Sequence, residues 1–186
     1  MNRKLATKII IASVVAAVVF AAAAFAAVSW YFPIRYSEIV HRNAERYGLE
    51  PALVFAVIHA ESKFDRYAVS RAGASGLMQI MNPTADWAAE IMGLMGYSYD
   101  RIFEPELNIQ IGCWYLAYLI DRFDYIDTAV SAYNAGEGNV ARWLADEQFS
   151  SDGVTLDEIP FRETRDYIRR VRFNTMVYRF LLKFYN

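Results

Sequence analysis

The chain has 186 residues, of which 55% are hydrophobic and 16% aromatic, and its formal charge is -2. This length predicts one packed domain with appendages rather than two full domains. Arg3, Lys4 and Lys8 are the only charged side chains before residue 35. Without these three positive charges, the formal charge falls from -2 for the whole chain to -5 for residues 35–186. An acidic domain without a basic block is a poor match for nucleic acid, so we expect no nucleic-acid partner.

Cysteine and histidine are too scarce to suggest a metal centre. One cysteine and two histidines give none of the ligand spacings of a zinc site, so we expect no metal and no other cofactor. The lone Cys113 has no second cysteine to pair with. Its neighbours Trp114 and Tyr115 favour a buried apolar position over the role of a nucleophile.

The N-terminal segment is predicted to cross a membrane. Residues 9–34 form an uncharged run of 26 residues, which as a helix exceeds the ~30 Å hydrocarbon core of a bilayer. The three basic side chains before it are expected to hold the N-terminus in the cytoplasm, and Trp30 and Tyr31 suit the far interface. We therefore predict that residues 1–34 form a cytoplasmic tip and a single-pass anchor in the cell membrane. Residues 35–186 would then lie on the outer side, periplasmic or extracellular.

A cleavable signal peptide is the alternative for the same segment. Ala24, Phe25 and Ala26 resemble the small-residue cleavage site of such peptides, although the uncharged run is longer than their usual apolar region. Cleavage would release residues 35–186 as a secreted protein. Both interpretations therefore export the same domain.

The exported part is predicted to be mainly α-helical. Apolar residues recur at helical spacing over residues 35–47, and Pro51 then opens an almost wholly apolar helix that ends near Glu61. The other helices are predicted over residues 82–92, 105–123, 126–133, 140–144 and 160–184, joined by loops over residues 97–104 and 146–159. Residues 70–81 contain too many small residues for a stable helix, so we expect loops or a short hairpin there.

Glu61 is the first candidate for chemistry. A carboxyl group at the end of an apolar helix is partly removed from water, which favours its protonated form and raises its pKa. A general acid that works near neutral pH needs such a shift, from ~4.3 toward ~6. A solvated glutamate at a helix end is the alternative, and composition alone favours it.

Four separated motifs favour a catalytic role for Glu61 over a solvated glutamate. They are Glu61-Ser62, GASGLMQIM at residues 73–81, AYNAG at residues 132–136 and IPFRETRDY at residues 159–167. Together and in this order they closely resemble the soluble-type lytic transglycosylases, whose catalytic domain has a goose-lysozyme-like fold. The resemblance covers the chain from about residue 36 to its end. It implies a mainly α, lysozyme-like catalytic domain over residues 35–186, with a small loop or hairpin region.

The resemblance also implies a reaction and a substrate. Glu61 would be the sole general acid/base, cleaving the β-1,4 bond between N-acetylmuramic acid and N-acetylglucosamine in the glycan strands of peptidoglycan. The muramoyl 6-hydroxyl would then close a 1,6-anhydro ring, assisted at the anomeric carbon by the substrate's N-acetyl group. Such a reaction needs no second carboxyl group, whereas retaining glycosidases hold two about 5–5.5 Å apart. No protein partner is predicted.

Three residues of the loop region match positions that contact the sugar in this family. Ser70 would contact the N-acetyl group, Gln79 would hydrogen-bond sugar amides, and Met81 would form an apolar floor. A turn stabilised by its own hydroxyl is the alternative for Ser70. Met78 is expected in the core.

Three more candidates come from later helices. Tyr133 would orient the Glu61 carboxyl or the 2-acetamido group, and Asn134 would shape the turn and also bind sugar. Glu163 would face the saccharide or its peptide stem, with ion pairs to Arg162 or Arg165 as the alternative.

Other polar residues nearby are expected to be structural. Asp65, four residues after Glu61, is interpreted as a surface or capping residue. Thr164, Arg165 and Tyr167 are expected to lock the last helix against the core.

Two other function classes remain open. The first is a hydrolase of the same fold, similar to goose-type lysozyme, whose products would carry one more water. The second is a non-catalytic glycan-binding scaffold, which would bind murein without cutting it.

Overall fold

The computed structural model describes residues 3–185, and only the backbone at residues 3–6 and 9. The chain divides into two compact units, Met1–Ile34 and Arg35–Asn186. The first unit contains α1, Arg3–Tyr31. Its stretch Ile10–Tyr31 is long and apolar enough to cross a membrane, a property shared by membrane anchors and signal peptides. The Arg3 and Lys4 side chains, which contribute to the predicted orientation, lie outside the described residues.

The second unit is built from helices, as predicted. Within residues 35–185 there are only isolated β-bridges, which pair Ser75 with Val69 and with Ile80. The region predicted to form loops or a short hairpin is thus a loop with two single bridges. The helices, with short 3-10 turns marked η, are α2 Ser37–Arg46, α3 Pro51–Ser62, α4 Asn82–Met92, η1 Tyr99–Phe103, α5 Pro105–Phe123, α6 Ile126–Ala135, α7 Glu137–Leu144, α8 Arg162–Leu181 and η2 Leu182–Phe184.

Proline and glycine mark several of the helix ends. Pro51 and Pro105 are the first residues of α3 and α5, where the missing N–H group costs no hydrogen bond. Gly93 ends α4 with a left-handed φ of 62°. Two details differ from prediction: the loop expected over residues 97–104 contains η1, and α7 begins at Glu137 rather than at residue 140. Only Gly136 separates α6 from α7, because its φ of 88° is not compatible with an α-helix.

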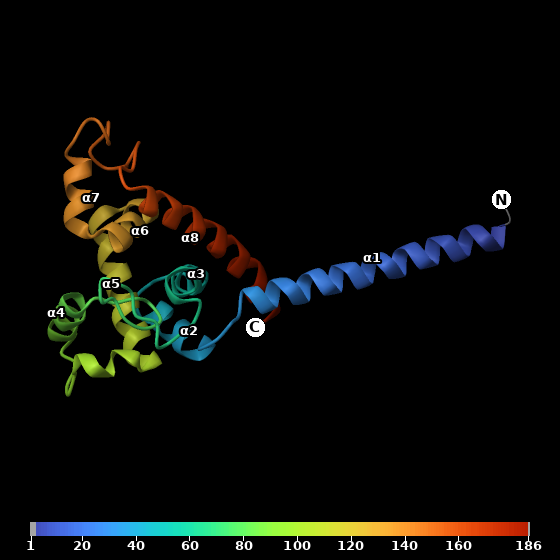
Figure 1. Ribbon diagram of the computed structural model, residues 1–186, viewed down its shortest axis with the longest axis horizontal. Coiled ribbons are helices and arrows are strands. Elements are labelled where there is room, and N and C mark those ends of the chain that lie inside the picture. Colours follow the sequence, from blue (N-terminus) through green and yellow to red (C-terminus); the bar gives the residue numbers. More distant parts are fainter. Residues whose placement is uncertain (1–2, 186) are drawn as a thin grey trace. The chain divides into compact units, whose positions relative to one another are not determined.

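α3 is the centre of this unit. Every residue from Ala52 to His59 is buried, so the helix is covered on all sides. α8 packs along α3, while α6 packs against α5, α7 and α8 (Figure 1). Because α3 and α8 lie side by side, side chains on the inner face of α8 reach the end of α3 that carries Glu61.

Candidate active site

Glu61 lies on the last turn of α3, where the helix stops abruptly. Lys63 and Phe64 take left-handed φ values of 51° and 66°, so the chain turns away immediately after Ser62. The Ser62 hydroxyl donates a hydrogen bond of 2.8 Å to the Leu77 carbonyl, which ties this turn to the loop over residues 63–81. Glu61 itself is partly buried. Its carboxyl group is therefore held at the junction of a rigid helix and a fixed loop.

The environment of Glu61 brings the pKa of its carboxyl group close to neutral pH. Burial is the largest influence and raises the pKa of Glu61 from 4.5 to about 7. The Tyr167 hydroxyl and the positive charge of Arg170 oppose this rise, and the negative charge of Glu163 adds to it. A pKa near 7 lets one group donate a proton and take one back at the same pH.

Three side chains that act on Glu61 come from one face of α8. Glu163, Tyr167 and Arg170 are spaced i, i+4, i+7, which places them on a single helical face. Tyr167 is 1% exposed. Its hydroxyl lies near enough to Glu61 to lower the pKa of the carboxyl group. This hydroxyl forms no hydrogen bond of ordinary geometry. Tyr167 was expected only to lock the helix. The i, i+4 spacing between Glu163 and Tyr167 could have indicated from the sequence that Tyr167 belongs to the site.

A buried amide fixes the loop that follows Glu61. Asn108 of α5 is fully buried, accepts the Met78 N–H at 2.7 Å, and donates to the carbonyl groups of Ser75 and Ile102. Gly76 passes so close that an added Cβ would lie 2.2 Å from the Asn108 amide nitrogen. Sequence reasoning missed Asn108, whose only signal is a polar residue within an apolar helix pattern.

A cavity of about 260 Å³ opens beside this loop and brings four predicted site residues together. Gln79, Met81, Tyr133 and Asn134 all line it. The Gln79 amide nitrogen donates to the carbonyl groups of Ala68 and Gly76, at 3.0 and 2.9 Å. Both of its hydrogens are thereby used, so the amide oxygen is the part that can accept a hydrogen bond from a ligand.

Tyr133 connects this cavity with Glu61. Its hydroxyl donates a 2.8 Å hydrogen bond to the Met78 carbonyl, and burial together with the charge of Glu61 raises the pKa of Tyr133 well above its ordinary value. The hydroxyl proton of Tyr133 is therefore donated to the loop backbone and not to Glu61. Tyr133 can still accept a hydrogen bond at its oxygen.

Comparison with known proteins gives a consistent result. The transglycosylase SLT domain family model matches residues 38–154. The soluble lytic murein transglycosylase of Escherichia coli K12 is 35% identical over 154 residues, which cover 81% of this chain and 24% of that protein. The membrane-bound lytic murein transglycosylase C of Haemophilus ducreyi is 35% identical over 161 residues, covering 74% of this chain and 43% of that protein. The chain belongs to the transglycosylase SLT domain family.

Solved structures support the same assignment. The second unit, residues 35–186, contains the matched residues 38–154 and is called the SLT domain below. The crystal structure of the 70 kDa soluble lytic transglycosylase of Escherichia coli matches with a TM-score of 0.74 and 31% identity, over 83% of this chain and 26% of that one. An inactive glutamate-to-glutamine mutant of a Pseudomonas aeruginosa lytic transglycosylase matches with a TM-score of 0.73 and 31% identity, over 83% and 25%. The chain spans from about a quarter to less than half the length of these relatives.

Two of the predicted site residues, Ser70 and Glu163, do not line the 260 Å³ cavity, and Asn134 lines it and also joins two helices. Ser70 does not line the 260 Å³ cavity, and its hydroxyl accepts the Ala74 N–H at 3.0 Å in a local turn. Asn134 accepts a 2.8 Å hydrogen bond from Thr164, which joins α6 to α8. Glu163 is exposed, and none of the described ion pairs joins it to an arginine.

Aromatic side chains extend from the cavity along α5 and α4. Tyr115 lines the cavity, and its ring centroid lies 5.5 Å from that of Tyr133. Trp87 meets Trp114 and Tyr118 edge-on, with ring centroids 4.9 Å apart in each case. Partly exposed rings of this kind can stack on sugars as well as on one another, a role that the sequence did not assign to them.

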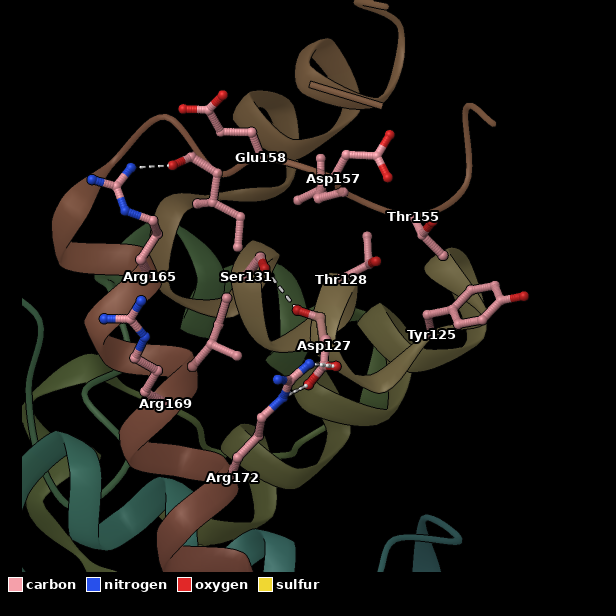
Figure 2. A pocket seen from close by; sticks show the side chains of 13 residues that line it. Tyr125, Asp127, Thr128, Ser131, Thr155, Asp157, Glu158, Arg165, Arg169 and Arg172 are labelled. Carbon is pink, nitrogen blue, oxygen red and sulfur yellow. Dashed lines mark hydrogen bonds and ion pairs between the residues drawn. The ribbon is translucent and has the colours of Figure 1, made fainter. Parts of the chain in front are cut away.

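A second cavity of the SLT domain lacks this chemistry. It measures about 450 Å³ and lies between α6, α8 and residues 155–159 (Figure 2). Its Asp127 carboxylate is held by Arg172, and its Asp157 carboxylate accepts the Ser151 N–H. None of the predicted site residues lines it. Within residues 3–185, no three His, Cys, Asp or Glu side chains come together as a metal site would require.

Proposed function

We propose that the chain is a murein lytic transglycosylase, which cleaves the β-1,4 bond between N-acetylmuramic acid and N-acetylglucosamine and leaves a 1,6-anhydro-N-acetylmuramic acid end. The observation that carries this proposal is the Glu61 carboxyl group, whose pKa of about 7 suits both directions of proton transfer. Relatives named lytic murein transglycosylases, at 35% identity, support the same reaction.

The proposed reaction moves one proton through Glu61. The protonated carboxyl group donates to the glycosidic oxygen, and the bond from this oxygen to the anomeric carbon breaks. The carboxylate then takes the proton of the muramoyl 6-hydroxyl, whose oxygen forms the new bond to the anomeric carbon. Between these steps Glu61 is negatively charged, and Tyr167 and Arg170 favour that state. Gln79, Met81, Tyr133 and Asn134 would hold the sugar beside it.

The described carboxyl groups near Glu61 favour this route over hydrolysis. Asp65 follows the left-handed turn at Lys63 and Phe64, so it does not stand one helical turn from Glu61. It is exposed, and its carboxylate accepts the Tyr67 N–H at 2.9 Å, as expected of a capping residue. Glu163 is exposed on α8 and has the smallest of the four influences on the pKa of Glu61. We assign Glu163 to substrate binding, along with Ser70.

Product analysis tests the reaction. Murein sacculi are digested with the wild-type protein, and the released muropeptides are weighed by mass spectrometry. Anhydro products, lighter by one water than hydrolysed ones, are expected. Glu61→Gln should lower the rate about a thousandfold, within the range of a lost general acid/base, while sacculus binding persists. Glu90→Gln, at an exposed position of α4, serves as the matched control and should retain full activity.

Other outcomes would identify the rival functions. Reducing N-acetylmuramic acid ends in the wild-type digest would show a lysozyme-like hydrolase. Binding of sacculi without cleavage by the wild-type protein would show a glycan-binding scaffold.

We also assign α1 to a single-pass anchor in the cell membrane, with the SLT domain on the outer side. Support comes from the span Ile10–Tyr31 and from relatives that are membrane-bound lytic transglycosylases. On this outer side the domain would reach peptidoglycan, its proposed substrate. Protease treatment of intact spheroplasts should digest the SLT domain, and a protected domain would contradict this orientation.

A further inference from the structure

The C-terminal half of α8 and the residues that follow it through η2 carry large exposed apolar side chains. Phe173, Met176, Phe180, Phe184 and Tyr185 are each between 51% and 61% exposed. We call these five residues the C-terminal apolar stripe. Scattered exposed apolar residues are ordinary in proteins, but a contiguous row along one helix marks an interaction surface.

This stripe lies opposite the face of α8 that packs in the core. Val171, Tyr178 and Leu181 are buried and belong to the inner face. At 3.6 residues per turn, Met176 and Phe180 point the other way, about half a turn from Tyr178. α8 is therefore apolar on two opposite sides, although one apolar side suffices for a surface helix of a domain.

The sequence around the stripe is basic, while the carboxylates of Glu50 and Asp127 from elsewhere in the domain lie close to it. From residue 167 to residue 186 there are five basic residues and no acidic ones. Arg172 and Arg179 pair with Asp127 and Glu50 elsewhere in the domain. Lys183 is exposed beside the stripe and forms no ion pair among the described residues. Apolar side chains flanked by lysine or arginine are the composition of helices that lie in the interface of an anionic bilayer.

Chain connectivity limits how far the domain can move from an anchor formed by α1. Only residues 32–36 separate the end of α1 from the start of α2, a reach of about 20 Å when fully extended. Within the SLT domain, a cavity of about 480 Å³ is lined both by His41 of α2 and by Arg179, Leu182 and Lys183 at the end of α8. The end of α8 thus lies on the side of the domain where the chain enters it.

From these observations we infer that the C-terminal apolar stripe inserts into the surface of the bilayer in which α1 is anchored. The occupant is a lipid surface with anionic headgroups. Met176 and Phe180 would enter the boundary between headgroups and acyl chains, and Lys183 would meet the headgroups. This second contact would fix the orientation of the domain on the membrane, which a single tether leaves free. The inference rests on the proposed anchor and is independent of the proposed reaction.

Site-directed spin labelling of the full chain tests the inference. Single-cysteine variants Met176→Cys and Phe180→Cys carry a nitroxide, and Met95→Cys, at a 95% exposed methionine after α4, is the matched control. The native Cys113 is buried and is left in place, with an unsubstituted sample to check its labelling. The proteins are reconstituted in phosphatidylcholine–phosphatidylglycerol liposomes. Accessibility to oxygen, which partitions into lipid, is compared with accessibility to a water-soluble nickel complex.

The expected result is an oxygen-to-nickel accessibility ratio several-fold higher at positions 176 and 180 than at position 95. Equal ratios at all three positions would place the stripe in water and overturn the inference. Spin–spin broadening at position 180 that disappears on dilution with unlabelled protein would overturn it in favour of a second copy of the chain. Failure of the protein to float with the liposomes would refute the anchor and the inference together. Sacculus digestion by the same samples reports the proposed reaction separately.

Discussion

Replacing Glu61 by glutamine should lower the cleavage rate about a thousandfold and at the same time stabilise the folded domain. Folding raises the pKa of Glu61 from 4.5 to about 7, chiefly through burial. At about 1.4 kcal/mol per pKa unit, keeping this carboxyl group charged in the folded state costs about 3 kcal/mol. Glutamine has nearly the same shape and carries no charge, so Glu61→Gln removes that cost.

The sign of the effect depends on pH. Below pH 4.5 Glu61 is protonated in both the folded and the unfolded chain, so the variant and the wild type should be about equally stable. As pH rises from 4.5 through 7, the unfolded chain releases the proton first, and the free energy of unfolding of the wild type falls. Above pH 7 the variant should therefore be more stable by about 3 kcal/mol, or about 6–12 °C in Tm for a domain of about 150 residues.

Urea unfolding of the full chain in detergent micelles measures this difference. Tryptophan fluorescence is followed from pH 5 to pH 8.5 for the wild type, Glu61→Gln and the control Glu90→Gln, whose exposed position predicts a change within about 0.5 kcal/mol. The gap between wild type and Glu61→Gln should open with rising pH. A gap that is constant over this range would refute the reasoning that burial of a charge sets the pKa of Glu61.

Three further substitutions test the surroundings of the acid. Tyr167→Phe removes a hydroxyl that lowers the pKa of Glu61, so the basic limb of the kcat/KM pH profile should move up by about one pH unit; a downward shift would contradict this. Gly76→Ala should destabilise the fold by more than about 2 kcal/mol in urea unfolding, because its Cβ meets Asn108 at a φ of +81°. Gly93→Ala, at a φ of +62° with no atom within 4 Å, is the control that isolates backbone strain from this clash. Asn108→Ala leaves the Met78 N–H and the Ile102 carbonyl group unpaired, whereas the Ser75 carbonyl group keeps the Ile80 N–H, and it should lower the free energy of unfolding by about 3–5 kcal/mol.

Local signals predicted the helices well because helix ends depend on nearby residues. Proline at the first positions of α3 and α5 and glycine after α4 act within one turn, so the sequence places these boundaries within a residue or two. Glu61 was a candidate from a local pattern, an apolar helix that ends in a carboxyl group, but its role as the acid came from the family resemblance and stays a prediction. The mainly α fold and the family followed from the motifs and are confirmed.

The partners of the site residues were not predictable, because they depend on packing between distant helices. Tyr167 reaches Glu61 only because α8 lies along α3, more than 100 residues later in the chain. The Tyr133 hydroxyl was expected to orient the Glu61 carboxyl group or the substrate's 2-acetamido group, and the sequence did not indicate that it donates to the backbone of Met78, 55 residues earlier. A motif indicates that a tyrosine is near a site, while the choice of acceptor is made by the three-dimensional arrangement.

The backbone of Met78 shows how the domain can tolerate a buried acid. Asn108 of α5 accepts its N–H group, and Tyr133 of α6 donates to its carbonyl group, so two helices hold the residue from opposite sides. Gln79 follows directly, lines the cavity and has a left-handed φ of 49°, which carries backbone strain. Strain here and the charge of Glu61 both lower stability, by about 1–3 kcal/mol and about 3 kcal/mol. The buried hydrogen bonds to the Met78 backbone offset part of this cost.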